Sequence, residues 1–369
     1  ASHIIGYVGI DNIGLDGLEY TFNQELTPPV IGNYKETVYG NQLFLTLDSS
    51  IQHTVEKIAD EVYREEKANS VMILVLDAPS GDILGYASLP NYDPNVLSTL
   101  TPATMRNKPI SLLYEPGSVF KVFSLAALLE LGALNETDTF FCNGYYEKPT
   151  GDGKMIRINC LGHHGSVTVR DILKYSCNAG AAYASDRANP ESFYKMLRLF
   201  GFGEPTGIPL NGEEDGTLRP PRLWSIRSKP TLAIGQEIAV TAMQVVKAAT
   251  AFANDGVLLQ PHIVKKILTP DGTLIKEYPR EPLRQVISPE IAQEILEYME
   301  SVTEANGTAT RARIPGVRVS AKTGTAQMID PDTGKYSETA YIASCLALFP
   351  TDSPQVIAYV VIESPQGDS

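Results

Sequence analysis

The chain has 369 residues, of which 43% are apolar and 20% charged, a composition that supports a sizeable core and excludes a disordered or fibrous protein. Its formal net charge of -13 would repel phosphate backbones, so nucleic-acid binding has no electrostatic basis. No apolar run approaches the roughly 20 residues of a membrane-spanning helix, and the first residues lack the layout of a signal peptide. The four cysteines are too few for a disulfide scaffold in a chain this long.

The first 45 residues differ in composition from the rest of the chain. Residues 1–45 are rich in Gly, Asn, Pro and Thr and carry only short apolar stretches, which favours a small accessory segment. The boundary is expected near Asn41. We therefore expect an accessory segment at 1–45 and a main domain at 46–369.

The main domain is predicted to begin with a helix and a β-hairpin. Apolar residues recur at helical spacing from Ser49 to Lys67, behind a Ser/Asp start, which predicts an amphipathic helix. Residues 71–76 and 83–88 have the pattern of two strands, and the Pro and Gly between them are typical of a tight turn.

A second group of strands is predicted near the C-terminus, with helices between the two groups. The strand patterns cover residues 317–326, 342–349 and 356–362. The clearest helical patterns cover residues 119–131, 240–253 and 289–305. Strands at both ends with helices between them predict an α+β domain. Strands from the two ends of the chain would complete one five-stranded antiparallel sheet, and helices would flank it.

The first candidate catalytic pattern is Ser118-Val-Phe-Lys121, which follows Pro116-Gly117 and continues into a helix that is apolar almost all round. Such a helix is buried, and the Pro-Gly entry places Ser118 in its first turn. Residues three apart share a helix face, so the Lys121 amine lies beside the Ser118 hydroxyl. Desolvation lowers the pKa of a lysine from ~10.4 toward roughly 7 to 8, which makes it a competent base for a serine nucleophile.

The same spacing occurs a second time, at Ser192 and Lys195, so the pattern alone is weak. In ordinary composition it arises on the order of once or twice by chance in a chain this long. The second copy lacks the Pro-Gly entry and lies in a helix with a polar face, which favours a surface position.

The second pattern is Ser176-Cys177-Asn178, which follows a helical stretch at 169–175. A Ser and an Asn two apart at a helix end are most often a cap or a turn. Its functional interpretation therefore depends on the other patterns.

The third pattern is Lys322-Thr323-Gly324-Thr325, at the end of a strand-like segment. A strand with a lysine and a glycine lets a substrate backbone lie against it, while the ammonium and hydroxyls hold a carboxylate.

The three patterns, in this order, are similar to the S-x-x-K, S-x-N and K-T-G set of penicillin-binding proteins and serine β-lactamases. Further segments resemble class B penicillin-binding proteins over nearly the whole chain from Gly14. They are Gly14-Leu-Asp-Gly-Leu-Glu19, Thr46-Leu-Asp48, Ala87-Ser-Leu-Pro-Asn-Tyr-Asp-Pro94, Tyr114-Glu-Pro-Gly-Ser118, Ala233-Ile-Gly-Gln-Glu237 and Gly307-Thr-Ala309.

This resemblance implies a peptidoglycan D,D-transpeptidase with the fold of the penicillin-binding protein and serine β-lactamase group. Ser118 would attack the penultimate carbonyl of a D-Ala-D-Ala stem peptide, Lys121 would act as its base, and Ser176 would relay a proton to the leaving nitrogen. Asn178 would hydrogen-bond the substrate amide. β-Lactams would acylate Ser118 covalently, and catalysis needs no cofactor.

The resemblance also implies how the substrate is held. Lys322, Thr323 and Thr325, with Gly324 between them, would bind the terminal carboxylate. The backbone N–H groups of Ser118 and Thr325 would meet the developing oxyanion, because preorganised donors stabilise charge that appears in the transition state.

Class B members are anchored in the cytoplasmic membrane and act on its outer face. We therefore expect an extracytoplasmic domain whose anchor is not present in this sequence, with residues 1–45 as the remnant of an N-terminal pedestal. The chain also ends earlier than such domains usually do, so the final helix of the family fold is expected to be absent or replaced. The expected partner is a membrane glycosyltransferase of the shape, elongation, division and sporulation family.

Two other functions share these patterns. A β-lactamase or β-lactam sensor would hydrolyse or report the acyl-enzyme, but no deacylating glutamate can be placed in the sequence. A catalytically idle division scaffold would keep only the fold, and the complete set of motifs argues against it.

A structural zinc site is expected at Cys142, Cys160, His164 and Cys177. Three cysteines and the pair His163-His164 fall within one short window, and zinc in structural sites takes four Cys or His ligands. Some class B relatives place a metal in this loop, and His164 is preferred because it directly precedes a glycine, as in the family. The alternatives are a disulfide between Cys142 and Cys160, or unrelated buried thiols.

Overall fold

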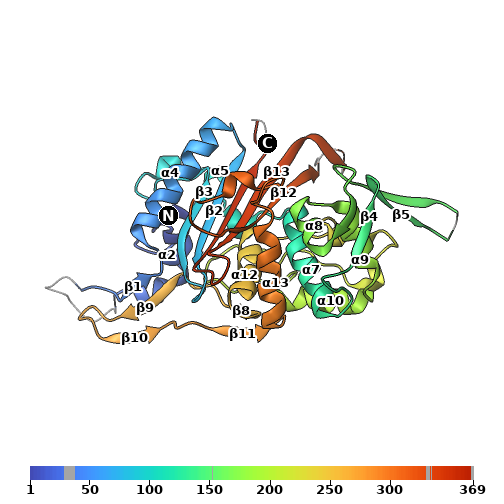
Figure 1. Cartoon of the computed structure of the whole chain (residues 1–369). Helices are drawn as coiled ribbons and strands as arrows, with labels where there is room; N and C mark the ends of the chain where they lie inside the picture. The colour runs from blue at the N-terminus through green and yellow to red at the C-terminus, as the bar shows by residue number, and fades with distance from the viewer. Residues whose placement is uncertain (29–37, 152, 330–332, 334, 367–369) are drawn as a thin grey trace.

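Strands from residues 70–89 and from residues 320–363 meet in one antiparallel sheet. The computed structural model describes residues 1–28, 38–151, 153–329, 333 and 335–366. The sheet has the strand order β12-β13-β14-β2-β3 (Figure 1), with bounds Ser70–Asp77 (β2), Ile83–Leu89 (β3), Ser320–Ile329 (β12), Tyr336–Phe349 (β13) and Val356–Glu363 (β14). Because β14 pairs with both β2 and β13, Val360 lies opposite Ile73 on one side and Cys345 on the other. The predicted five-stranded sheet is confirmed.

Both faces of this sheet are packed against other elements, and β2 contributes apolar side chains to both faces. Successive side chains of a strand point to opposite faces. Val71 packs with Val55 of α4 (Ser49–Glu65), whereas Met72 belongs to the larger core on the other face. Asp48 begins α4 by accepting hydrogen bonds from two backbone N–H groups, and the predicted helix is confirmed.

Helices form the second half of the fold. Figure 1 shows α12 and α13 beside the sheet and α7, α8, α9 and α10 beyond them. Their bounds, with that of α11, are Lys121–Glu130 (α7), Val169–Lys174 (α8), Asn178–Asp186 (α9), Pro190–Leu199 (α10), Ser228–Ala233 (α11), Ala242–Ala253 (α12) and Pro289–Glu300 (α13). Every residue of α7 except Glu130 is buried, as the apolar pattern predicted.

One helix is shorter than expected. The pattern predicted a helix to residue 305, but α13 ends at Glu300. The Ser301 and Thr303 hydroxyls donate to the carbonyl oxygens three residues earlier. These side-chain hydrogen bonds compete with the backbone hydrogen bonds that would continue the helix.

Short elements that the sequence analysis did not identify surround this frame. Three are pairs: β4 (Thr139–Cys142) with β7 (Gly165–Thr168), the hairpin β5 (Tyr145–Pro149) with β6 (Met155–Asn159), and β8 (Val257–Leu259) with β11 (Pro282–Gln285). The short helices are α1 (Ser2–Ile5), α2 (Gly17–Thr21), α3 (Asn23–Leu26), α5 (Pro102–Met105) and α6 (Lys108–Ser111).

The expected accessory segment is hydrogen-bonded to the main domain at its end. Strand β1 (Gln42–Leu45) pairs with β9 (Val264–Leu268), which also pairs with β10 (Leu274–Glu277). Residues 29–37 of that segment lie outside the described residues. The division into 1–45 and 46–369 stays a prediction.

Candidate active site

Ser118 lies in a tight turn directly before α7. Residues Gly117–Phe120 form one 3-10 turn, so Ser118 is in the first turn of the buried helical segment, as predicted. Gly117 has a φ of 54°, a left-handed conformation that favours glycine. A Cβ at Gly117 would lie 2.8 Å from the carbonyl oxygen of Thr325, so the turn packs directly on β12.

Gly324 makes this close packing possible from the other side. A Cβ there would lie 2.9 Å from the Pro116 carbonyl oxygen and 2.9 Å from Val119 Cγ2. From the sequence, this glycine was predicted to leave room for a substrate backbone, and it does line the cleft. It also makes room for the turn that carries Ser118.

The fully buried Lys121 points from α7 into a polar cluster. Its Nζ donates to the Ser176 carbonyl oxygen at 2.9 Å and to Asn178 Oδ1 at 2.6 Å, and lies 2.8 Å from Ser118 Oγ. Burial lowers the pKa of Lys121 to about 8. A substantial fraction of the amine is therefore neutral near physiological pH.

The contacts of Lys121 suit a neutral amine that acts as a base. The Ser176 carbonyl and Asn178 Oδ1 are acceptors only, and they match the two N–H groups that a neutral amine keeps. Asn178 Nδ2 donates to the Asn159 carbonyl oxygen at 3.1 Å, which fixes the orientation of the amide. The remaining lone pair of Lys121 is then directed at Ser118.

The second motif occupies the junction between α8 and α9. Ser176 has a φ of 54°, which is uncommon for a residue with a side chain and typical of strained functional positions. Its Oγ lies 3.3 Å from Lys121 Nζ and 3.1 Å from Lys322 Nζ. The serine hydroxyl is therefore a bridge between the amines of the first and third motifs.

The third motif lies on β12, next to the central strand β13. Lys322 is fully buried, and its Nζ also donates to the Thr323 carbonyl oxygen at 2.8 Å. Burial and the nearby Lys121 charge lower the pKa of Lys322. Thr323 Oγ1 donates to Thr308 Oγ1 at 3.0 Å.

A cleft of about 580 Å³ joins the three motifs. Its lining includes Ser118, Ser176 and Asn178 together with Thr323, Gly324 and Thr325. Lys121 and Lys322 are not part of the lining because they lie behind Ser176. A larger hollow of about 720 Å³ lies between residues 1–5, α4 and β3, but it carries none of the motifs.

The structure brings Cys142, Cys160, His164 and Cys177 together beside the cleft. One ligand atom from each residue lies within 4.8 Å of the other three. In a tetrahedral zinc site with zinc–sulfur distances of about 2.3 Å, two sulfurs lie about 3.8 Å apart. The Cys160 and Cys177 sulfurs are 3.8 Å apart, and His164 Nδ1 lies 3.6 Å from Cys142 Sγ and 3.5 Å from Cys160 Sγ. The donor set fits zinc.

The thiols of this cluster are held by the second motif. Cys160 Sγ accepts the backbone N–H of Asn178 at 3.3 Å. The hydrogen bond between Cys160 and Cys177 lowers the pKa of the Cys160 thiol and raises that of Cys177, so the pair favours a single thiolate at Cys160. All four cysteines of the chain are described and none forms a disulfide, and His163 is exposed as expected.

The second Ser-x-x-Lys pattern lies elsewhere, on α10. Lys195 is exposed, and the backbone N–H of Ser192 donates to Asn189 Oδ1 at the start of the helix. The surface position expected for this copy is confirmed.

Comparison with known proteins identifies the family. Residues 71–369 match the model described as the penicillin binding protein transpeptidase domain. The chain belongs to this family. Stage V sporulation protein D of Bacillus subtilis is 35% identical over 387 residues, which cover 99% of this chain and 59% of that protein. Penicillin-binding protein PbpB of Mycolicibacterium smegmatis is 31% identical, over 99% of this chain and 60% of that protein.

Solved structures of the penicillin-binding family share the fold. A crystal structure of penicillin binding protein 3 from Mycobacterium tuberculosis, complexed with aztreonam, has a TM-score of 0.91 and 29% identity. The match covers 100% of this chain and 83% of that one. The chain spans about three fifths of the length of the curated relatives named above. In the part of the chain that the structure describes, no helix is long and apolar enough to cross a membrane.

Several residues of this transpeptidase domain's cleft were not predicted as site residues. Thr308 and Gln236 line it, and both lie in segments that the sequence analysis quoted only for their resemblance to the family. Asn159, whose carbonyl orients Asn178, carries no local signal, and neither does the exposed cleft residue Leu161.

Proposed function

We propose that the chain is a peptidoglycan D,D-transpeptidase with Ser118 as its nucleophile. The observation that carries this proposal is the continuous hydrogen-bonded path from Ser118 through Lys121 and Ser176 to Lys322. A serine hydroxyl is a weak nucleophile until a nearby base accepts its proton. Lys121 is such a base, because its pKa of about 8 leaves part of it neutral at physiological pH.

In the acylation step, Ser118 Oγ bonds to the penultimate D-alanyl carbonyl carbon while Lys121 accepts the hydroxyl proton. The C–N bond to the terminal D-alanine then breaks, and Ser176 passes a proton to the leaving nitrogen. The backbone N–H groups of Ser118 and Thr325 would meet the oxyanion, because preorganised donors stabilise charge that develops in the transition state. An amine from a second stem peptide then takes the acyl group and releases Ser118.

The substrate carboxylate would be held by the hydroxyls of Thr323 and Thr325, which line the cleft. Lys322 lies behind Ser176, so its ammonium would attract the carboxylate by charge rather than by direct contact. Low local dielectric strengthens such an interaction. Asn178 would hydrogen-bond the substrate amide.

Intact mass after incubation with a penicillin tests the proposal. A strained β-lactam mimics the D-Ala-D-Ala carbonyl, and we expect one adduct per chain, located at Ser118. The Ser118→Ala variant should lose the adduct, while the matched Ser192→Ala variant should keep it. An adduct on Ser192, or none in the wild type, would refute the assignment; rapid release of hydrolysed penicillin would favour a β-lactamase, and an inert protein would favour a scaffold.

We also propose that Cys142, Cys160, His164 and Cys177 bind a structural zinc ion, which would fix the loop from Cys160 to His164 against the second motif. The sulfur–sulfur and sulfur–nitrogen distances support this proposal. Metal analysis of untagged protein, purified without added zinc, should give about one zinc per chain, with thiols exposed on chelation. Absence of metal, with two thiols fewer than the reduced count, would favour a disulfide.

The remaining proposals concern the intact protein. Residues 1–45 would be the end of an N-terminal pedestal, and the domain would act on the outer face of the cytoplasmic membrane. Its partner would be a membrane glycosyltransferase of the shape, elongation, division and sporulation family. Co-purification of the membrane-anchored protein with such an enzyme, compared with a version lacking residues 1–45, tests the pairing and the boundary together.

A further inference from the structure

The end of α13 and the turn after it contact the helix that precedes the second motif and a residue of the third motif itself. We call this stretch, residues 300–308, the α13 tail. None of its residues belongs to the three motifs, and the mechanism proposed above does not use its charges. Its two acidic residues, Glu300 and Glu304, point to different partners.

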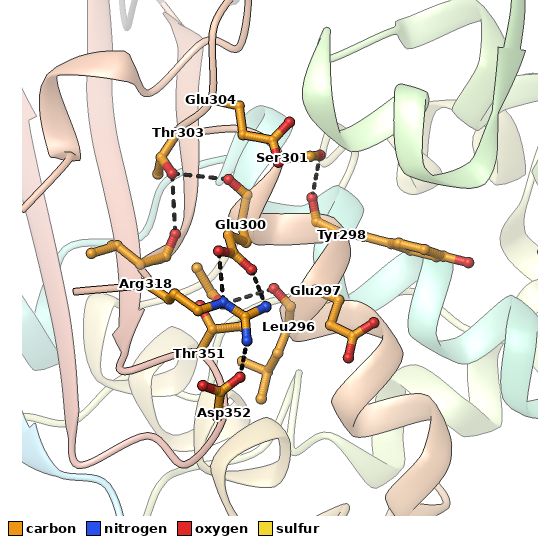
Figure 2. Close-up of polar contacts among 12 residues, drawn as sticks. Leu296, Glu297, Tyr298, Glu300, Ser301, Thr303, Glu304, Arg318, Thr351 and Asp352 are labelled. Carbon is orange, nitrogen blue, oxygen red and sulfur yellow. Dashed lines mark hydrogen bonds and ion pairs between the residues drawn. The ribbon is translucent and has the colours of Figure 1, made fainter. Parts of the chain in front are cut away.

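Glu300 forms an ion pair with Arg318, in the segment just before β12. The Arg318 guanidinium donates to both carboxylate oxygens of Glu300 and also to Asp352, in the turn between β13 and β14. Figure 2 shows Arg318 between these two carboxylates. Arg318 lies four residues before Lys322, so its position bears on where the third motif begins.

Buried hydroxyl groups reinforce the same junction. Thr303 Oγ1 donates to the Val319 carbonyl oxygen at 3.3 Å (Figure 2). Ser320 is fully buried, and its Oγ donates to the Leu296 carbonyl oxygen of α13 at 2.7 Å. Besides the ion pairs, hydroxyl hydrogen bonds therefore join the tail to Val319, just before β12, and α13 to Ser320, the first residue of β12.

Glu304 holds the helix that leads to the second motif. Its two carboxylate oxygens accept from Arg170 at 3.3 Å and from Lys174 at 3.2 Å. These two cations are four residues apart on α8 and so share one face of the helix. Lys174 lies two residues before Ser176.

The tail also reaches the cleft itself. Thr308, at its end, accepts a hydrogen bond from Thr323 of the third motif at 3.0 Å. One continuous stretch of nine residues thus contacts α8, the start of β12 and the cleft-lining part of β12.

We infer that Glu300 and Glu304 are positioning residues that set the spacing between Ser176 and Lys322. The inference rests on the proposed function, because that spacing matters only if Ser176 relays a proton. Isolated surface ion pairs contribute little to stability, but bidentate and networked pairs can fix geometry. A proton relay is sensitive to displacements well below 1 Å, so the effect should appear in the rate rather than in the stability.

The test compares glutamine variants that each remove one negative charge. Glu300→Gln, Glu304→Gln and their double variant are compared with Glu297→Gln, an exposed glutamate on the same helix that accepts from Gln293. The binding constant and the acylation rate constant are measured separately with a chromogenic β-lactam. We expect the rate constant to fall roughly threefold to tenfold in each single variant and further in the double variant, with Glu297→Gln unchanged.

Three further readouts separate positioning from general damage. Melting temperatures of the single variants should stay within about 2 °C of the wild type, as expected for surface substitutions. Added salt should slow the wild type toward the rate of the double variant, because it screens the ion pairs. Lys174→Gln combined with Glu304→Gln should cost no more than Glu304→Gln alone, because that change already removes the pair with Lys174.

The possible failures are distinct. A double variant that acylates as fast as Glu297→Gln refutes the inference, and so does a rate loss that follows the melting temperature. If Arg318→Lys, which keeps the charge but loses the bidentate fork, equals the wild type, Glu300 is not a positioning residue. A wild type that forms no Ser118 adduct refutes the proposed function before any variant is compared.

Discussion

Lys322 Nζ lies 3.1 Å from Ser176 Oγ, so the lysine of the third motif is directed at the serine of the second. The same hydroxyl lies 3.3 Å from Lys121 Nζ. Two buried amines on opposite sides of one serine repel each other when both are charged, and this repulsion contributes to the lowered pKa of Lys322. The arrangement leads to four predictions about the chemistry.

The acylation rate should depend on the protonation of Lys121. Because burial lowers the pKa of Lys121 to about 8, the neutral base form gains population as pH rises through that value. The rate constant for acylation should therefore rise with pH, reach half of its plateau near pH 8 and level above that value. Measurement with a β-lactam whose own charge is constant over this range checks the profile, and a rate that falls between pH 6 and 8 would contradict it.

Replacing Lys121 with methionine should slow acylation severely and abolish the pH dependence of its rate constant. General-base contributions are typically about 100- to 10,000-fold, and we expect a loss in that range. Lys195→Met is the control, because Lys195 occupies the same place in the second Ser-x-x-Lys pattern but is exposed. Retention of the wild-type profile in Lys121→Met would remove Lys121 from the base role.

Replacing Ser176 with alanine should slow acylation without displacing Lys121. The backbone carbonyl of Ser176, which accepts from Lys121 Nζ at 2.9 Å, is kept in this variant, whereas the bridging hydroxyl is lost. We expect a loss of roughly 100-fold or more in the acylation rate constant. The wild-type pH midpoint should remain, and an unchanged rate would exclude Ser176 as the relay.

The Lys322→Ala substitution should affect negatively charged ligands more than neutral ones. The lost ammonium should weaken binding of a β-lactam that carries a free carboxylate more than binding of the corresponding ester. The second-order acylation rates of both ligands, in the variant and in the wild type, give the ratio. If the variant prefers the acid over the ester as strongly as the wild type does, Lys322 does not recognise the carboxylate.

Gly324→Ala should destabilise the domain because its methyl group meets Pro116 and Val119 at 2.9 Å. Overpacking of this kind costs typically about 1–3 kcal/mol. The matched control is Gly151→Ala, where no atom lies within 4 Å of the added Cβ. Thermal unfolding of both variants is the measurement, and equal melting temperatures would show that the Ser118 turn tolerates displacement from β12.

Short-range patterns made much of the site predictable. Ser118 and Lys121 are three residues apart on one buried helix, so sequence spacing alone places them together. The position of Lys322 behind Ser176 was not predictable in this way, because it depends on how β12 packs against the α8–α9 junction. The same holds for Glu300 and Arg318, whose contact joins the end of one element to the approach of another.

The larger elements were predictable because their apolar patterns are long. The hairpin β5–β6 was missed because its strands are only five residues long, with the sequences YYEKP and MIRIN. Among the described residues of these two strands, only Tyr146 and Ile158 are buried in the core, and Arg157 lies over the ring of Tyr145, 3.5 Å from its centre. The strand predicted from Val317 begins instead at Ser320, because Arg318 and Val319 are bound to the end of α13. Local propensity does not carry information about such tertiary contacts.

The position of β14 has a consequence for how the enzyme is made. This strand lies at the centre of the sheet, yet it spans Val356–Glu363 and follows the sheet's other four strands in the sequence. Without it, the hairpin β2–β3 and the pair β12–β13 have no strand-to-strand hydrogen bonds with each other. Contacts between segments so distant in sequence form slowly. The sheet that carries the third motif is therefore completed only once residues 356–363 are available for pairing.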